Sequence, residues 1–170
     1  REVFHEIQRF EDEIEANDST YWLFFELLWR EYFQWIALKN GKDLFLPLGL
    51  QKEKPFKGGF NAKAFERWTT GTTGDDFVDA NMKELAATGF MSNRGRQNVA
   101  SYLVHDMGLD WRAGASYFES QLMDYDPASN YGNWLYNAGR GNDPRPFRKF
   151  NTTFQAERYD PDGKFIDAWL

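Results

Sequence analysis

The sequence predicts an all-α fold, an irregular helical bundle that forms a single domain over residues 1–170. Three observations lead to this prediction. Apolar residues recur at helical spacing along most of the chain, Gly and capping residues separate these stretches, and no pair of alternating stretches indicates a β-hairpin. A length of 170 residues suffices for one sizeable core, and no internal repeat indicates a solenoid.

The N-terminal part of the chain is expected to contain two helices and a loop. The first helix is indicated by apolar residues at helical spacing, Val3, Ile7, Phe10 and Ile14. Asp18 and Ser19 offer the N-cap of a second, strongly apolar helix, which Gly41 ends. The Lys, Gly and Pro content of residues 45–61 then predicts a loop.

The remaining helices are expected between capping residues and glycines. Asp75 and Asp110 each offer an N-cap, Pro127 suits a first helical turn, and Gly89, Gly108 and Gly139 mark C-terminal ends. The Gly, Asn and Pro residues after Gly139 predict a long loop. The helices are therefore expected over residues 75–89, 93–107, 110–122, 127–139 and 153–158.

The composition excludes several kinds of site. The absence of Cys excludes disulfides, thiolate metal sites and Cys nucleophiles, and with only two His residues we expect no metal site. Aromatic residues make up 18% of the chain, which favours stacking surfaces or electron-carrying rings, with core packing as the alternative for each ring. No apolar run is long enough to cross a bilayer, so we expect a soluble, cytoplasmic protein.

The net charge of −6 argues against a protein that coats nucleic acid by charge alone. One segment is locally basic and forms either a basic patch or a solvated loop; its cations are Arg140, Arg145, Arg148 and Lys149. The chain begins at Arg1 rather than Met and stops within what reads as continuing structure. We therefore expect it to be a fragment of a longer protein.

The most informative feature is a set of polar residues among aromatic and apolar neighbours between residues 89 and 145. Its members are Arg94, Arg96, Asp124, Asp126, Asn130 and Asn133. Burying an ionised group without a partner costs several kcal/mol, so such a set is either an internal salt-bridge network or the lining of a pocket for a flat, polar ligand. Paired carboxylates also suit glycosidase-type acid–base chemistry, but no companions of a sugar site are present.

An isoalloxazine ring is one ligand that fits this set, because its faces are apolar and its edge carries a donor at N3, carbonyl acceptors and the redox nitrogen N5. Arg96 paired with Asp124 keeps that carboxylate ionised. Asp126 can then accept a hydrogen bond from N3–H, and Asn130 can reach N5.

Two further groups are candidates for a site. Trp111, Trp134 and Tyr136 are either core residues or rings that pass electrons or stack on a base. Glu26 and Arg30 are four residues apart on one helix face with Trp29 beside them, which indicates either an exposed ion pair or a pocket.

Several stretches of the chain closely resemble the flavin-binding domain of the photolyase and cryptochrome family. They are FFELLWREYF, TGTTGDDFVDANMKELAATGFMSNRGRQNVASYL, DWRAGASYFESQLMDYDPASNYGNWLYNAGRGNDPR and FNTTFQAERYDPDGKFIDAWL. The motifs NRGRQNVAS and SNYGNWLY resemble those of the DASH-type cryptochromes. The resemblance implies an all-helical domain that holds FAD folded in a U, in which light drives an electron from the reduced flavin into a cyclobutane pyrimidine dimer and splits it.

The resemblance also implies roles for individual residues. Around the flavin it places Arg30, Asn93, Arg96, Asp124, Asp126 and Asn130. At the lesion it places Glu26 as a carboxylate, Trp29 as a stacking ring and Arg94 close by, while Gln97 and Tyr136 stand where ordinary photolyases carry Met and Trp. Trp134 and Trp111 match the inner two members of the Trp chain that photoreduces the flavin, and the outermost member, expected shortly before Trp68, is absent.

These matches lead to an expectation about the whole protein: a deoxyribodipyrimidine photolyase of DASH type, monomeric, acting on pyrimidine dimers in DNA and preferring single strands. We expect its antenna pigment, such as a folate, in an N-terminal domain outside these residues. Because the segment that binds the FAD phosphates also lies outside them, we expect residues 1–170 alone to bind FAD weakly and to be inactive. The alternatives are a blue-light receptor without repair activity, and a cofactor-free helical module that binds single-stranded nucleic acid.

Overall fold

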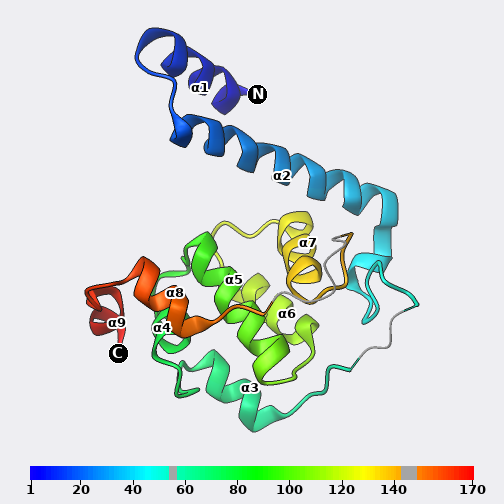
Figure 1. The fold of residues 1–170 in the computed structure, drawn as a ribbon. Coiled ribbons are helices and arrows are strands. Elements are labelled where there is room, and N and C mark those ends of the chain that lie inside the picture. Colours follow the sequence, from blue (N-terminus) through cyan, green and yellow to red (C-terminus); the bar gives the residue numbers. More distant parts are fainter. Residues whose placement is uncertain (54–56, 143–148) are drawn as a thin grey trace.

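The computed structural model describes residues 1–53, 57–142 and 149–170, and within these ranges the regular structure is helical (Figure 1). One isolated bridge joins Gly59 to Leu109. The all-α prediction is therefore confirmed. The α-helices are α1 (Glu2–Glu13), α2 (Asp18–Asn40), α3 (Ala62–Thr69), α4 (Asp76–Thr88), α5 (Asn93–Ser101), α6 (Trp111–Gln121), α7 (Pro127–Asn137), α8 (Thr152–Tyr159) and α9 (Lys164–Trp169).

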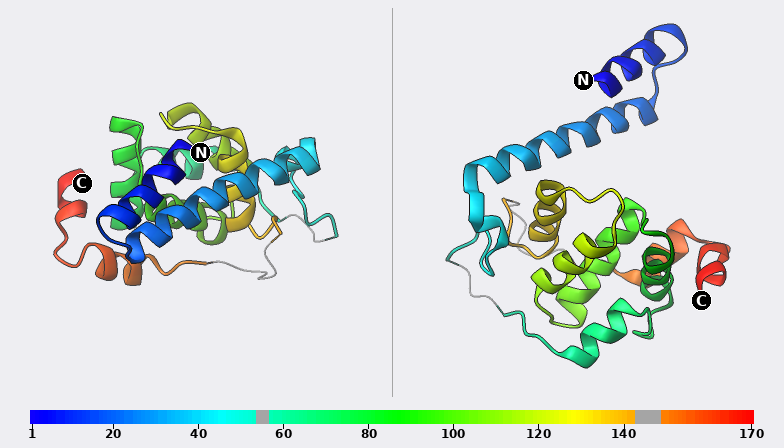
Figure 2. Two further views of the ribbon diagram at one scale, coloured as in Figure 1. Left: turned by 90° about the horizontal axis from the view of Figure 1, so that it is seen from above. Right: turned by 180° about the vertical axis from the view of Figure 1, so that it is seen from behind.

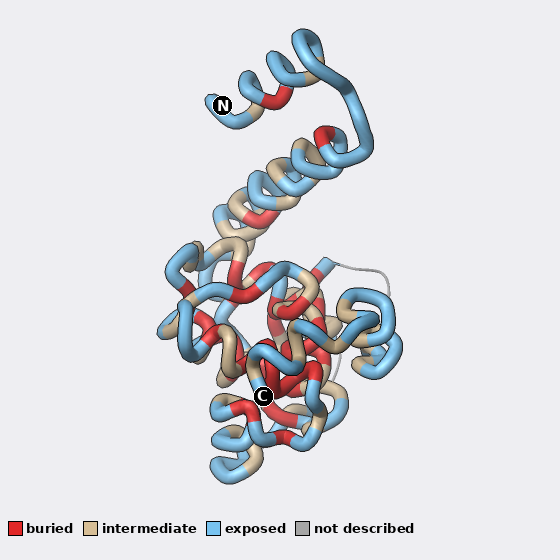
Figure 3. Tube along the Cα trace, turned by 90° about the vertical axis from the view of Figure 1, so that its left-hand side faces the viewer, coloured by how far each residue is buried: buried red, intermediate tan, exposed pale blue. Residues whose placement is uncertain are grey.

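Helices α3 to α9 form a packed body, and α1 with the N-terminal half of α2 extends away from it (Figures 1 and 2). Helix α1 folds back beside α2, and the C-terminal half of α2 lies along α7. The buried residues gather in the body rather than in this arm (Figure 3). No helix in the described part of the chain is long and apolar enough to cross a membrane.

The long helix α2 begins one residue earlier than the sequence analysis indicated. Its N-cap is Asn17, whose side chain accepts hydrogen bonds from the backbone N–H of Ser19 (2.9 Å) and of Thr20 (3.2 Å). The hydroxyl of Thr20 completes a capping box by accepting from the N–H of Asn17. Asn17 was passed over in favour of Asp18 because both residue types cap well and their order alone does not separate them. The predicted end at Gly41 is confirmed, with φ +53°.

The helices that surround the site begin where the sequence indicated. Asp75 and Asp110 cap α4 and α6 through hydrogen bonds from the backbone N–H groups of Val78 (3.0 Å) and Arg112 (2.9 Å). Helix α4 stops at Gly89, whose φ of +70° suits a residue without a Cβ. Pro127 occupies the first turn of α7 as predicted.

The helix predicted over residues 93–107 is only partly regular. After Ser101 the chain widens into the π-helical turn η2 (Tyr102–Asp106), in which the N–H of Met107 donates to the carbonyl of Tyr102 (3.0 Å). A π-helical turn accommodates one extra residue and is common near functional sites. The chain also contains α3, α9 and the 3-10 turn η1 (Gly41–Phe45), which the sequence analysis did not identify.

Three tryptophans fill the centre of the body. Trp68, Trp111 and Trp134 are at most 2% exposed, and Trp68 donates its indole N–H to the carbonyl of Val99 (3.0 Å). The ring of Trp134 lies 6.2 Å from that of Trp68 and 5.2 Å from that of Phe118, measured between centroids. Buried aromatic pairs of this geometry stabilise a core beyond their area alone.

Helix α2 approaches α7 closely because α7 carries a glycine at the crossing point. A Cβ on Gly132 would lie 2.2 Å from Cδ1 of Phe33, a buried residue of α2. The contact holds α2 against the body, although little else of α2 is buried. It therefore sets the position of the side chains that α2 presents near α7.

We expect Gly132→Ala to lower the free energy of unfolding, because overpacking against the Phe33 ring costs about 1–3 kcal/mol and outweighs the gain of about 1 kcal/mol in helix propensity. Gly59→Ala is the matched control, since a Cβ there meets nothing within 4 Å. Urea denaturation of both variants measures the difference. Equal stability of the two variants would show that the crossing tolerates a wider spacing.

Candidate functional site

Two adjoining cavities lie beside α5 and α7; α6 closes the smaller one and α2 the larger one. The smaller has a volume of about 290 Å³ and the larger about 820 Å³, and the larger falls within the range of about 300–1,000 Å³ usual for small-molecule sites. The residues that line both are Asn93, Arg96, Gln97, Asp124, Asp126, Ser129 and Asn133. Because the cavities share these residues, a ligand in one lies next to a ligand in the other.

The polar set singled out in the sequence lines these cavities. Asn130 lines the smaller cavity, Arg94 the larger, and the remaining four members line both. The structure therefore brings together residues from two separate segments, 94–96 and 124–133, as the pocket hypothesis required. It also contains the ion pair of the alternative hypothesis, so the two interpretations are compatible.

The smaller cavity has an apolar wall and a polar edge. The wall is formed by Met91, Ala100, Phe118, Leu122 and Trp134. The edge is formed by Asp124, Asp126, Asn130, Asn133 and Asn137. This division suits a flat ligand whose faces are apolar and whose rim carries hydrogen-bonding groups.

Helix α7 and its N-cap supply most of the polar edge, through polar residues that lie along one face of the helix. Asp126, Asn130, Asn133 and Asn137 follow one another at steps of four, three and four residues. The sequence analysis missed Asn137, which is 4% exposed, although its helical spacing from Asn130 and Asn133 was the signal that could have identified it.

Two oxygen atoms on this edge are acceptors without a partner in the described part of the chain. The amide nitrogen of the buried Asn130 donates to the carbonyl of Ala115 (3.0 Å), which fixes the amide and leaves Oδ1 with no hydrogen bond. Asp126 caps α7 with Oδ1, which accepts from the N–H of Ser129 (2.8 Å), and leaves Oδ2 with none. A ligand with ring N–H donors satisfies both oxygens.

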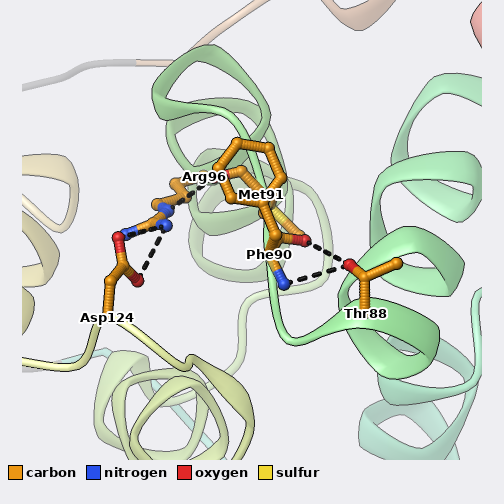
Figure 4. Close-up of polar contacts among 5 residues, drawn as sticks. All are labelled: Thr88, Phe90, Met91, Arg96 and Asp124. Atoms are coloured by element: carbon orange, nitrogen blue, oxygen red, sulfur yellow. Dashed lines mark hydrogen bonds and ion pairs between the residues drawn. The ribbon is translucent and has the colours of Figure 1, made fainter.

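The ion pair between Arg96 and Asp124 fixes the part of the polar edge that lies before α7 in the chain. Nη2 of Arg96 donates to both carboxylate oxygens of Asp124 at 3.0 Å, and Nε donates to the carbonyl of Met91 at 2.8 Å (Figure 4). The turn before Met91 is itself fixed, because Thr88 Oγ1 accepts from the N–H of Phe90 at 3.1 Å. The pair joins the start of α5 to the loop before α7.

Tyr125 places a neutral phenol at the same edge. Burial, the charge of Glu119 and a hydrogen bond to it, and the charge of Asp126 raise the pKa of Tyr125. The raised pKa extends to more alkaline pH the range in which the phenol keeps its proton and donates to Glu119.

The larger cavity is lined by groups from α2, α5 and α7. Glu26, Trp29 and Arg30 line it from α2, and the ring of Trp29 meets that of Tyr136 edge to face at 5.9 Å between centroids. Glu26 makes no ion pair within the described ranges. The ion pair between Glu26 and Arg30 that the spacing allowed is not formed, since Arg30 instead approaches Glu31 at 3.7 Å.

The two tryptophans of the candidate electron chain differ in position. Trp134 lines the smaller cavity, whereas Trp111 lines neither cavity. Trp111 donates its indole N–H to the carbonyl of Pro47 (3.2 Å). The two meet the same turn of α6, because Trp134 packs on Gly114, three residues after Trp111.

The basic segment is only partly described. Arg145 and Arg148 lie outside the described residues. The charge of Lys149 is neutralised by Asp106 at 2.5 Å, and Arg140 is half-buried. The described members therefore do not form an open patch of cations.

The comparisons with known proteins agree with one another. The family model of the FAD binding domain of DNA photolyase matches residues 22–170. The chain is 57% identical to the cryptochrome DASH of Xenopus laevis over 171 residues, covering all of this chain and 32% of that protein. It therefore spans about a third of the length of this curated relative.

Solved structures show the same architecture. A cryptochrome from Synechocystis sp. superposes with a TM-score of 0.94 at 53% identity over all of this chain and 35% of that one. An archaeal photolyase from Sulfolobus tokodaii, solved with two FAD molecules, gives a TM-score of 0.85 at 35% identity over 96% of this chain and 37% of that one. The chain thus belongs to the photolyase and cryptochrome family, is similar over its whole length to DASH-type cryptochromes, and matches that family's FAD-binding domain over residues 22–170.

Proposed function

We propose that this chain is the core of a light-driven flavoprotein that repairs cyclobutane pyrimidine dimers in DNA by electron transfer and prefers single-stranded lesions. The observation that carries the proposal is the pair of adjoining cavities. One has an apolar wall and a polar edge that suit a flavin ring, and the other presents a carboxylate and an indole one helical turn apart. Electron transfer needs cofactor and substrate to lie next to each other, and shared walls meet that need.

The smaller cavity fits the isoalloxazine ring of FAD. The Oδ1 atom of Asn130 would accept a hydrogen bond from a protonated N5, and Asp126 would accept one from N3–H. Arg96 holds its charge against Asp124 beside the ring, while Asn93 and Arg30 are suited to contact other parts of the cofactor. When bound, FAD supplies light-driven one-electron chemistry.

The larger cavity fits the pyrimidine dimer. Glu26 offers a carboxylate without an ion pair in the described part of the chain, which can accept hydrogen bonds from pyrimidine N–H groups. The indole of Trp29 offers a flat, apolar face, supported by the Tyr136 ring at its edge. Gln97 from α5 lines the same cavity and closes it with a polar group.

The preference for single strands follows from the small binding free energy that stacking in this cavity returns when a base is flipped out of a duplex. Taking a base out of a duplex costs a few kcal/mol of unstacking and unpairing, roughly the amount that one or two good stacking contacts return. Tyr136 and Gln97 offer less stacking area than the Trp and Met that ordinary photolyases carry at these positions. An unpaired lesion avoids the cost, so it enters more readily.

Trp134 and Trp111 are proposed to pass electrons inward to the flavin. Trp134 borders the smaller cavity, and Trp111 lies one turn of α6 from the Gly114 contact of Trp134. Both rings are buried from water, which suits a conductor that must not react with solvent. Substituting either ring by Phe, which is hard to oxidise, tests this route through the rate of flavin photoreduction.

We expect Asp126→Asn in the full-length protein to lower FAD affinity roughly tenfold or more, because a hydrogen bond to a charged group contributes about 1.5–3 kcal/mol. Asn caps a helix as well as Asp does, so α7 is preserved. Asp110→Asn is the matched control, because Asp110 caps α6 and lines neither cavity. Flavin absorbance after desalting gives the result, and equal FAD retention by the two variants would contradict the assignment of Asp126.

We expect Glu26→Gln to leave the flavin content unchanged and to weaken binding of a dimer-containing oligonucleotide about tenfold, through loss of a charged acceptor. Glu31→Gln is the control on the same helix, outside the cavity. Affinity and repair are measured on the same lesion in single-stranded and duplex DNA.

Three results would count against the proposal. Unchanged lesion binding in Glu26→Gln would remove Glu26 from the site. Equal repair of both DNA forms would contradict the strand preference. A wild-type protein that photoreduces its flavin but repairs neither form would be a blue-light receptor instead.

A further inference from the structure

The guanidinium group of Arg94 is held at the larger cavity by neutral groups. Its Nη1 donates to Oε1 of Gln97 at 3.0 Å, and its Cζ lies 4.9 Å from the centroid of the Tyr159 ring. Within the described ranges no carboxylate pairs with it. The positive charge of Arg94 is therefore positioned but not neutralised.

Arg96, two residues further along the same helix, shows the contrast. Its charge is neutralised by both oxygens of Asp124, and its Nε is satisfied by a backbone carbonyl. A partly buried cation without a counter-ion is costly unless an anion arrives to pair with it. The two arginines therefore have different tasks: Arg96 fixes the wall, and Arg94 is free to pair with an anion from outside.

Tyr159 belongs to a segment far along the chain that is anchored separately. It is the last residue of α8, and its side chain takes part in no hydrogen bond within the described residues. Helix α8 is fixed by its Asn151 cap and by a hydrogen bond from Thr152 Oγ1 to Asp75 at the start of α4 (2.5 Å). Because α8 is docked on α4, the Tyr159 ring is a fixed surface against which Arg94 rests.

We infer that Tyr159 is a positioning residue which, together with Gln97, holds Arg94 so that its guanidinium binds a phosphate of the DNA strand whose lesion enters the larger cavity. The inference rests on the proposed function. A guanidinium matches a phosphate in shape and charge, and one already fixed against a ring loses less conformational freedom when it binds. The cation–π contact orients Arg94 without neutralising it, which an acidic partner could not do.

A phosphate of FAD is the alternative anion that Arg94 could bind. The DNA phosphate is favoured because Arg94 lines the larger cavity together with Glu26 and Trp29, the two groups proposed to bind the lesion. Flavin content measured in every variant separates the two sources.

The test is a double-mutant cycle in the full-length protein with FAD bound, using a fluorescent single-stranded oligothymidylate that carries one dimer. Tyr159→Leu is expected to raise Kd roughly three- to tenfold through the loss of the cation–π contact. The slope of log K against log salt is expected to fall by about 0.7, the value for one phosphate contact on a single strand. Repair at saturating DNA and flavin content stay at the wild-type level.

Two companion variants show whether Tyr159 acts through Arg94. Tyr159→Phe keeps the ring and is expected to bind like the wild type. Adding Tyr159→Leu to Arg94→Gln is expected to change Kd less than twofold beyond Arg94→Gln alone, because the residue that Tyr159 positions is already gone. Since Tyr159 is 47% exposed, the substitution leaves the core intact, and thermal melting checks this.

The inference is overturned by wild-type affinity in Tyr159→Leu, by equal weakening in Tyr159→Phe, or by full additivity with Arg94→Gln, which would mean that Tyr159 touches the DNA independently. Loss of flavin in Tyr159→Leu would assign the Arg94 contact to the cofactor instead. An undamaged oligonucleotide, which would bind through the same phosphate, separates failure of the inference about Tyr159 from failure of the proposed function. A wild type without preference for the dimer refutes the proposed function, while the cycle on undamaged DNA still decides the role of Tyr159.

Discussion

The site depends on one steric constraint, the close crossing of α2 over α7 at Gly132. The Phe33 ring occupies the space that a Cβ at that position would need. This contact brings Glu26 and Trp29, which α2 carries two turns and one turn before Phe33, over the polar face of α7. With a wider spacing the wall that the two cavities share would remain, because none of its residues belongs to α2, but Glu26 and Trp29 would lie farther from that wall and from a ligand in the smaller cavity.

Charge is distributed over this shared wall unequally. Arg96 and Asp124 neutralise each other, so they hold the wall together without attracting further ions. Asp126, Glu26 and Arg94 have no ion-pair partner in the described part of the chain, and each faces a cavity. Because an unpaired charge near a protein interior is unfavourable, these three groups mark where a ligand completes the structure. Structural and ligand-binding charges are thus separable by their partners, although they are interleaved in the sequence.

Much of the fold was readable from local signals, since Gly41, Gly89 and the caps Asp75 and Asp110 act within one helical turn. Helix α9 was missed because six residues are too few to show a periodic apolar pattern. Helix α3 was missed although its N-cap Asn61 was a local signal that could have identified it. The π-helical turn after Ser101 depends on one extra residue that leaves no mark in the spacing. The polar set of the site was visible because charged and amide side chains are rare among core residues.

Tyr159 shows the limit of such reasoning. Nothing in its local sequence distinguishes it from a surface tyrosine, and its contact with Arg94 bridges 65 residues of chain, from 94 to 159. The contact exists because α8 docks on α4, which in turn places the start of α5. The position of α8 thereby determines how Arg94 lies in the larger cavity, although no residue of α8 lines that cavity. Residues that orient a binding group from behind carry no chemical signature of their own, and only the structure identifies them.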